Sequence, residues 1–396
     1  MHIKNILIAL SMIFLAFAEP AFAECNETEK PVTDLGQRFG IGKELTTSNP
    51  TDSVSHFNPT SKARYLRFLI EAANLGTSPW YLTIRDEQSH PVQVLGREDF
   101  VNGGKRWSQR IPGDVAYFDL DTLGKPSPVT IEVEQYIAMP ETAKNPYYSL
   151  QNPDSPTFKP LYKDGVQAVK RRLGDSVGFL MSSWDKASWC CSGVMIAPDL
   201  FLTNWHCGGG GAAAGLAEKY YWSQDVCDST LIDLSWDDSG ASNEYTCTKV
   251  EASVHDLDFA VLRIAPTASN ARAKPIVIRA KTEELNEFVN IVHHPSCDRK
   301  QISEDCQITK ADYPNWIAKT DMTDFSYQCD TEKGSSGAPV FDSNGLLIGL
   351  HHLGFASDNS CASTDKENKA IQIGRIVDFL RADPKYAPIV KELRIR

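Results

Sequence analysis

Short runs of alternating apolar and polar residues recur between residues 65 and 134, separated by Gly, Pro and Asp. Alternation with a period of two is typical of strands with one buried face, and the residues between the runs favour turns. Five strands joined in this way predict a small β-sandwich over about residues 61–140. The five runs are 65–70, 80–84, 92–95, 115–120 and 129–134.

The pattern changes after the predicted sandwich. Prolines recur among polar residues from 140 to 163, which predicts an extended linker over residues 141–172. A short helical pattern at 166–173 closes the linker and contains the basic cluster Lys170-Arg171-Arg172. This cluster is either a processing site or a solvated helix face, and the sequence favours both interpretations equally.

A second, larger domain is predicted from residue 173 to residue 396. Residues 176–180 read as its first strand, and apolar residues at helical spacing from 371 to 380 predict a closing helix. A chain of 396 residues is long enough for two domains, or for a domain with a pro-segment.

Residues 1–23 have the pattern of a signal peptide, which makes residues 24–140 the N-terminal region of the exported chain. Lys4 lies in a basic start, an apolar run follows at 6–18, and Ala21-Phe22-Ala23 forms a cleavage signal. The apolar run is too short for a membrane anchor, so no stable membrane insertion is expected. The sequence therefore predicts a secreted or periplasmic protein.

The candidate chemistry begins at residues 333–340, which read KGSSGAPV. A serine hydroxyl is a poor nucleophile at neutral pH, so it needs a tight turn, a neighbouring base and free backbone N–H groups. Gly334 and Gly337 permit such a turn around Ser336. The same octapeptide would also suit an ordinary hairpin loop, so other residues must decide.

Two other stretches supply the missing groups. His206 ends the second of two short β-type runs and is flanked by cysteines. Asp258 directly precedes the apolar run 259–264, which would carry it toward the interior, whereas Asp256 is expected to face water. A base, an acid and a serine are therefore all present in the same domain.

In their chain order, His206, Asp258 and Ser336 resemble the chymotrypsin-fold serine peptidases, with the closest likeness to secreted bacterial lysyl and glutamyl endopeptidases. The motifs that carry the resemblance are FLTNWHC at 201–207, LDFAVL at 257–262, HHPS at 293–296 and CDTEKGSSGAPVF at 329–341. The resemblance covers about residues 173–380. It implies a mainly β fold with two six-stranded antiparallel barrels, preceded here by the sandwich and followed by the C-terminal helix.

The same resemblance implies a serine endopeptidase that acts on protein or peptide substrates. His206, Asp258 and Ser336 would be catalytic, and the backbone N–H groups of Gly334 and Ser336 would form the oxyanion hole. Activity is expected to fall below about pH 6 or 7 as the histidine becomes protonated. The alternative is a catalytically inactive homologue that acts as a binding protein.

The candidates for the substrate pocket conflict with one another. Asp330 lies six residues before Ser336, as in trypsin-like enzymes that cut after basic residues, and an acid of the later loop is an alternative. Thr331 and His351 match the glutamyl endopeptidase pattern instead, and His352 would face the opposite side of the same strand. We expect an acidic or small residue before the cut, and the alternative is that His351 only packs.

Ten cysteines, all beyond residue 23, indicate disulfides in an oxidising compartment. The resemblance implies the pair Cys191–Cys207. The remaining expected pairs, with other connectivities left open, are Cys297–Cys306, Cys329–Cys361, Cys227–Cys247 and Cys25–Cys190.

Several function classes are disfavoured. A net charge of −11 argues against a nucleic-acid partner, because phosphate binding needs a basic face. Metal ligation is not expected, since neither C-x-x-C pairs nor H-E-x-x-H occur, and no cofactor is predicted. The sequence does not indicate the oligomeric state.

Overall fold

The structure is a computed structural model, and its described part begins at residue 54 with the first strand, β1 (Val54–Phe57). The described residues are 54–57, 63, 65–100, 105–122, 129–139, 148–149, 157–184, 187–209, 216–237, 243–267, 271–281, 283–315, 317–318, 320–354 and 367–396. The predicted signal peptide, Cys25 and Cys361 lie outside these ranges.

The N-terminal half is the predicted β-sandwich. One sheet has the strand order β1-β7-β3-β4, and in the other β2 pairs with β5, β6 and β8. Alternating apolar side chains of both sheets meet between them, where the rings of Phe68 and Phe118 contact edge to face. The strands are β1 (Val54–Phe57), β2 (Tyr65–Asn74), β3 (Trp80–Arg85), β4 (Pro91–Gly96), β5 (Lys105–Trp107), β6 (Ile111–Pro112), β7 (Ala116–Thr122) and β8 (Thr130–Met139).

The first barrel follows the linker and is closed by six antiparallel strands in the order β11-β12-β13-β16-β15-β14. Nearly every residue of β11 and β13 is buried, because the inner face fills the barrel and the outer face is covered by other elements. Its elements are β11 (Val177–Trp184), β12 (Ala187–Ala197), β13 (Leu200–Thr203), α2 (Gln224–Asp228), β14 (Leu231–Asp233), β15 (Glu244–Val254) and β16 (Phe259–Pro266).

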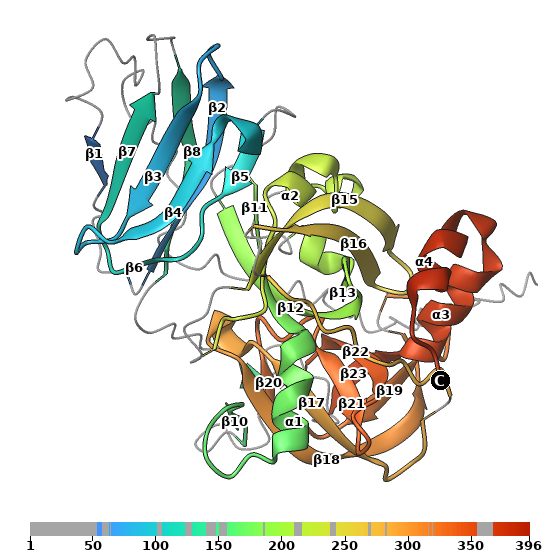
Figure 1. The fold of residues 1–396 in the computed structure, drawn as a ribbon. Coiled ribbons are helices and arrows are strands. Elements are labelled where there is room, and N and C mark those ends of the chain that lie inside the picture. The colour runs from blue at the N-terminus through green and yellow to red at the C-terminus, as the bar shows by residue number, and fades with distance from the viewer. Residues whose placement is uncertain are drawn as a thin grey trace, which may run out of the picture.

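The second barrel has the order β18-β17-β21-β22-β23-β19 and closes where β18 also pairs with β19. Two closed six-stranded barrels confirm the fold that the resemblance implied. The strands are β17 (Phe288–His293), β18 (Gln301–Tyr313), β19 (Asp324–Tyr327), β21 (Pro339–Asp342), β22 (Leu347–Leu353) and β23 (Asn368–Gln372). Figure 1 shows the sandwich beside the first barrel and the second barrel beyond it.

The linker pairs with the second barrel at two points. Strand β10 (Lys159–Pro160) lies along β18, and β9 (Tyr148–Ser149) pairs with β20 (Thr331–Glu332), the strand that leads into the loop of Ser336. Helix α1 (Ala168–Leu173) carries the basic cluster, and its Lys170 forms ion pairs with Glu304 and Asp305.

The C-terminal helices are α3 (Ile373–Ala382) and α4 (Ala387–Glu392), drawn in red at one side of the barrels in Figure 1. The predicted helix at 371–380 is thus present, but its first two residues belong to β23 instead. Six short 3₁₀ turns complete the described secondary structure, at Arg97–Phe100, Gly174–Ser176, His206–Gly208, Glu218–Tyr220, Pro295–Cys297 and Pro384–Tyr386.

A buried charge cluster joins the sandwich to the first barrel. Arg67 of β2 is 1% exposed and binds Asp233 Oδ2 at 2.7 Å and Glu244 Oε2 at 2.5 Å. Arg110 approaches the same two carboxylates at 3.4 and 3.5 Å. Trp107 Nε1 of the sandwich donates to Ser229 O of the first barrel at 2.8 Å. The Trp107 ring also packs in a buried apolar cluster with residues of the barrel, so the interface between sandwich and barrel has both polar and apolar contacts.

The disulfides correct part of the expected connectivity. The structure contains the expected pairs Cys191–Cys207 and Cys227–Cys247. It joins Cys190 to Cys297 and Cys306 to Cys329, so the expected pairs Cys297–Cys306, Cys329–Cys361 and Cys25–Cys190 are wrong. The cause is packing between the barrels: β11 contacts β17, and β12, which carries Cys190, pairs with β11.

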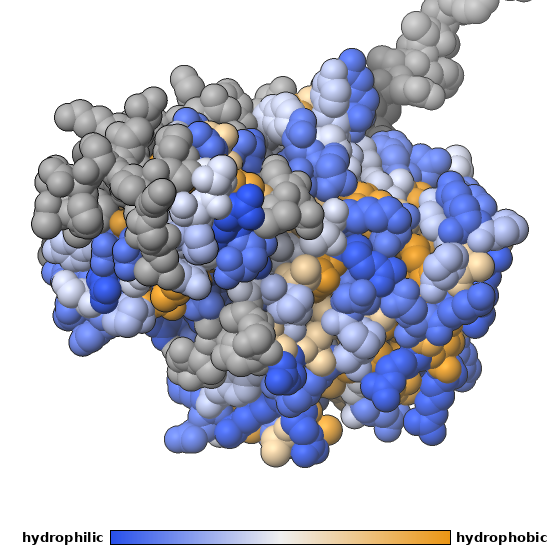
Figure 2. Space-filling model, turned by 45° about the horizontal axis from the view of Figure 1, so that its top comes forward, coloured by the Kyte–Doolittle hydropathy of each residue, from blue (hydrophilic) through white to orange (hydrophobic). Residues whose placement is uncertain are grey.

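The surface is predominantly polar. On the face drawn in Figure 2, hydrophilic residues surround separate small groups of apolar ones. Among the described residues, no helix has both the length and the apolar character that crossing a bilayer requires.

Candidate active site

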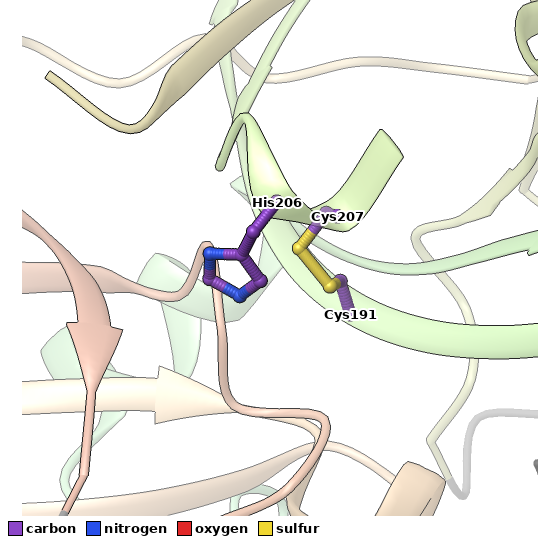
Figure 3. Close-up of side chains that lie close together, drawn as sticks. All are labelled: Cys191, His206 and Cys207. Carbon is purple, nitrogen blue, oxygen red and sulfur yellow. A yellow bond between two sulfur atoms is a disulfide. The ribbon is translucent and has the colours of Figure 1, made fainter. Parts of the chain in front are cut away.

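His206 and Asp258 are brought together by the pairing of two strands of the first barrel. Thr203 at the end of β13 pairs with Ala260 near the start of β16, so the residues just beyond each strand end are neighbours. His206 opens a short 3₁₀ turn three residues beyond β13, and Asp258 directly precedes β16. Figure 3 shows the imidazole of His206 projecting away from this turn, next to the disulfide between Cys191 and Cys207.

The contact between the two side chains is direct. His206 Nδ1 lies 2.8 Å from Asp258 Oδ2 and 3.1 Å from Oδ1. The backbone N–H of His206 also donates to Oδ1, at 3.0 Å, so the carboxylate holds both the ring and the turn that carries it. Because the aspartate is fully buried and the histidine ring is 17% exposed, the ring can reach solvent while its partner cannot.

Asp258 has a second histidine partner, which was not foreseen from the sequence. His352 Nδ1 lies 3.3 Å from Asp258 Oδ2, and His352 Nε2 lies 2.8 Å from Asp324 Oδ2. Burial by itself would lower the pKa of His352, but the two carboxylates outweigh it and raise the pKa to about 9. Likewise, burial alone would raise the pKa of Asp258, but His206 and His352 hold it well below its ordinary value.

This buried row of alternating charges therefore runs from Asp324 through His352 and Asp258 to His206. The ring of His352 is an imidazolium at neutral pH, because its pKa of about 9 lies above that range. An ionised Asp258 between two imidazole rings can hold a proton on Nδ1 of His206, which makes Nε2 the nitrogen that can exchange a proton with another group.

Ser336 lies at the same end of the first barrel, although it follows β20 of the second half of the domain. Its carbonyl oxygen accepts a hydrogen bond from the backbone N–H of Ser192 at 2.7 Å, and lies 3.9 Å from the Sγ of Cys207, the residue after His206. The residue is partly exposed, whereas both neighbours in the chain are buried. The structure thus presents one serine between two residues fixed in the interior.

The two glycines around Ser336 are required by the backbone. Gly334 and Gly337 have φ values of +92° and +82°. A Cβ on Gly337 would lie 2.2 Å from Ser192 O, and one on Gly334 would lie 2.6 Å from His294 O. Neither position accepts a side chain, because both the conformation and the close approach exclude it.

The predicted pocket residues are all buried. Asp330 Oδ2 accepts hydrogen bonds from the backbone N–H and the hydroxyl of Thr157, both at 2.7 Å. Thr331 lies in β20 under the linker strand β9. His351 Nδ1 lies 2.6 Å from the hydroxyl of Tyr327, and burial keeps the pKa of this histidine well below its ordinary value.

Thr157 and Asp324 were missed in the sequence, and His352 was predicted only as a residue of the substrate pocket. Thr157 lies in the proline-rich linker, and no motif in that stretch indicated a role for it. Asp324 carried no motif. His352 is adjacent to His351 on a strand, and the opposite orientation of neighbouring side chains was the available signal that the two histidines have different surroundings.

One group of side chains has metal-ligand spacing. The donor atoms of Cys191, His206 and Cys207 all lie within 4.8 Å of one another. The two sulfurs are bonded to each other, so neither is a thiolate, and a thiolate is the form in which cysteine ligates a metal. The donor set therefore does not fit a resident metal ion.

Comparison with known families matches residues 191–350 to the trypsin-like peptidase domain. The chain is also similar to the mouse serine protease FAM111A, with 22% identity over 251 residues, which are 54% of this chain and 40% of that protein. The chain thus matches well under half of that relative's length.

Several solved structures align with this chain at low identity. A Glu endopeptidase aligns with 17% identity and a TM-score of 0.40, over 58% of this chain and 98% of its own. The HtrA-type protease AlgW aligns with 18% identity and a TM-score of 0.41, over 54% and 62%. The Rv3671c protease from M. tuberculosis, in its active form, aligns with 17% identity and a TM-score of 0.40, over 57% and 90%.

Proposed function

Since residues 191–350 form a trypsin-like peptidase domain within two six-stranded barrels, we propose that this chain is a secreted or periplasmic serine endopeptidase. In this proposal the catalytic groups are His206, Asp258 and Ser336. The observation that carries it is the 2.8 Å contact between His206 Nδ1 and a fully buried aspartate, at the barrel end where Ser336 is exposed on a glycine-bounded turn.

The mechanism uses the histidine as a proton carrier. Asp258 holds His206 in the tautomer with hydrogen on Nδ1, so Nε2 accepts the proton of the Ser336 hydroxyl as its oxygen attacks the scissile carbonyl. The imidazolium then gives this proton to the leaving amine, and an acyl-enzyme remains on Ser336. Water, deprotonated by His206, hydrolyses the ester and restores the serine.

The charge that develops on the carbonyl oxygen needs donors fixed in advance. The backbone N–H groups of Gly334 and Ser336 are the proposed donors, and one such donor contributes roughly 3 kcal/mol in measured cases. Gly334 suits this role because it has no side chain between its N–H and an approaching substrate.

The pocket favours an acidic or small residue before the cut rather than a basic one. The Asp330 carboxylate that would attract lysine or arginine already accepts two hydrogen bonds from Thr157 and is fully buried. A basic substrate side chain would have to displace these donors before pairing with the carboxylate. Thr331 and His351 remain the other proposed residues of the pocket, whereas His352 lies between Asp258 and Asp324.

Cleavage-site profiling on a mixed peptide library tests the function and the preference together. The purified chain is expected to cut internal bonds, mostly after acidic or small residues, and Ser336→Ala is expected to remove all cutting while the fold is retained. Cleavage that survives in the alanine variant would show a different nucleophile. No cleavage in either protein would favour the inactive binding homologue.

A further inference from the structure

The HHPS motif at 293–296 belongs to the resemblance but has no role in the mechanism above. It follows β17 and leads into the turn Pro295–Cys297, and we call residues 293–297 the cradle segment. Residues 332–337, which include both proposed oxyanion donors, are called the oxyanion loop. The structure places the cradle segment directly against this loop.

One link joins His293 to Ser335, the residue before the proposed nucleophile. His293 Nδ1 lies 2.8 Å from Ser335 Oγ, and both side chains are fully buried. The hydroxyl also accepts a hydrogen bond from the backbone N–H of Glu332, at 3.2 Å. The hydroxyl hydrogen is therefore available to the ring nitrogen, and Ser335 ties the start of the loop to the cradle segment.

Further contacts fix the peptides on either side of Gly334. Ser296 donates from its backbone N–H to Lys333 O at 2.6 Å, and from its hydroxyl to Glu332 Oε2 at 2.5 Å. Ser192 bridges the two segments, because its hydroxyl accepts from His294 N–H at 3.0 Å and donates to Gly334 O at 2.8 Å. In a planar trans peptide the C=O and the N–H of the next residue point in opposite directions. The bond to Lys333 O therefore orients the N–H of Gly334, and the bond from Ala338 N–H to Ser335 O, at 2.9 Å, orients the N–H of Ser336.

The cradle segment itself has an unusual backbone. Ser296 and Cys297 are both left-handed, with φ values of 51° and 60°, although neither is glycine. Non-glycine residues in this region cost free energy and persist where surrounding contacts hold them. The disulfide from Cys297 to Cys190 and the close approach of His294 O to Gly334 are such contacts.

We propose that His293 is a positioning residue, which holds the oxyanion loop through Ser335 so that the N–H groups of Gly334 and Ser336 face the developing oxyanion. This inference rests on the proposed serine mechanism and adds a residue that does not touch the substrate. A loop fixed before the reaction needs no rearrangement when the negative charge appears. The contribution therefore belongs to the transition state rather than to substrate binding.

The test compares two replacements of His293 with the same amount of side-chain disturbance. The amide oxygen of His293→Asn lies close to the place of Nδ1 and can accept the hydrogen of Ser335, whereas His293→Leu has a similar size and no acceptor. We expect the leucine variant to lower kcat about 10- to 100-fold, with KM changed less than about threefold. The asparagine variant is expected to recover most of kcat.

A second readout separates loop geometry from a loss of packing. A peptide aldehyde, which forms a tetrahedral adduct with the serine, is expected to lose affinity in the leucine variant by about the same factor as kcat. A peptide product that binds without forming the adduct is expected to keep its affinity. His90→Asn, on the exposed histidine of the sandwich, is the matched control and should change neither constant.

Ser335→Ala removes the same link from its other end and serves if the leucine variant does not fold. It is expected to lower kcat to a similar extent, and the double variant is expected to be no slower than the slower single variant. Folded variants with unchanged kcat, or equal losses for leucine and asparagine, would overturn the proposed role of His293. Wild-type protein that cleaves no peptide would overturn the serine mechanism, and the inference with it.

Discussion

The two buried charge clusters of this chain have opposite uses for a similar arrangement. Between the sandwich and the first barrel, Asp233 and Glu244 lie against Arg67 and Arg110. At the candidate active site, Asp258 and Asp324 lie against His206 and His352. In both clusters two fully buried carboxylates join segments that are distant in the chain, and each pair of acids lies against two basic side chains.

The difference lies in the chemistry of the cation. An arginine keeps its charge at every pH at which proteins fold, so the interface cluster can lock two parts together but cannot transfer a proton. A histidine gains and loses its proton near neutral pH, so the second cluster can do catalytic work and is sensitive to pH. A buried acid beside arginine can thus only stabilise the structure, whereas a buried acid beside histidine can also support proton transfer.

The largest effect is expected from removing the acid of the reactive cluster. Asp258→Asn keeps the size of the side chain but can no longer hold His206 in the required tautomer, so turnover should fall by about 10⁴-fold. Steady-state kinetics and a circular dichroism spectrum check both parts of this prediction. Full activity in the asparagine variant would show that another group orients His206.

The next largest effect is expected at the interface, on stability rather than turnover. Arg67→Met leaves two buried carboxylates with Arg110 alone, and removing one partner of a buried pair costs about 3–5 kcal/mol. Urea unfolding measures this loss. We expect turnover per folded molecule to be unchanged.

The matched control for Arg67 is Arg85→Met on the same sandwich. Arg85 lies 3.6 Å from Asp119, and both side chains are about one-third exposed, at 33% and 37%. Exposed pairs of this kind contribute about 0–1 kcal/mol. Equal losses for the two variants would contradict the structural role assigned to the buried cluster.

The same cluster predicts the outcome of a cut between the two halves. Cleavage after Arg172, the processing site considered for the linker, would leave Arg67 and Trp107 bound to the first barrel. We therefore expect the sandwich to co-elute with the larger fragment on size exclusion under native conditions, and to separate in the Arg67→Met variant. Release of the sandwich from the cut wild-type chain would refute this expectation.

A smaller effect, which depends on pH, is expected from His352. Its folded pKa of about 9 lies above the ordinary value of about 6.5, so the protonated ring stabilises the fold fully below about pH 6.5. This contribution, about 3 kcal/mol at most, disappears as the pH rises to about 9. The free energy of unfolding, measured from pH 6 to 9.5, should therefore differ between wild type and His352→Gln mostly at the acidic end.

The interface cluster provides the comparison for this experiment. The loss in Arg67→Met should be the same at pH 6 and pH 9, because arginine does not titrate in this range. A difference for His352→Gln that does not change with pH would mean that His352 is not a buried cation.

The sequence was sufficient for those elements of the fold that depend on local pattern. Strands β2, β3, β4, β7 and β8 contain the five alternating runs, and Asp258 was distinguished from Asp256 because it adjoins a buried strand. The short strands β1, β5 and β6 were missed, since two to four residues carry too little periodicity.

Contacts between distant segments could not be predicted in the same way. Cys190 meets Cys297 because two barrels pack together, and spacing along the chain carries no trace of that packing. His352 was considered for the pocket because of its neighbour His351, whereas the structure places it between Asp258 and Asp324. The charge of His352 depends on the two carboxylates beside it, which are distant in the sequence.

The smallest predicted effect concerns another buried acid, Asp330, which accepts two hydrogen bonds from neutral Thr157. Thr157→Val removes the hydroxyl donor but keeps the backbone N–H, so the relative rate of cutting after arginine should rise a few-fold, about 1 kcal/mol. Matched peptides that differ only before the cut measure this ratio. Asp330→Asn in the same background should cancel the rise, and no change in either variant would place Asp330 outside the substrate pocket.

The most direct test of the proposed mechanism is reaction with a fluorophosphonate, followed by peptide mass spectrometry. We predict a covalent adduct on Ser336 alone, formed much more slowly in Asp258→Asn and not at all in Ser336→Ala. An unlabelled Ser336 in folded wild-type protein, or an adduct on another residue, would contradict the proposal that His206 and Asp258 activate this serine.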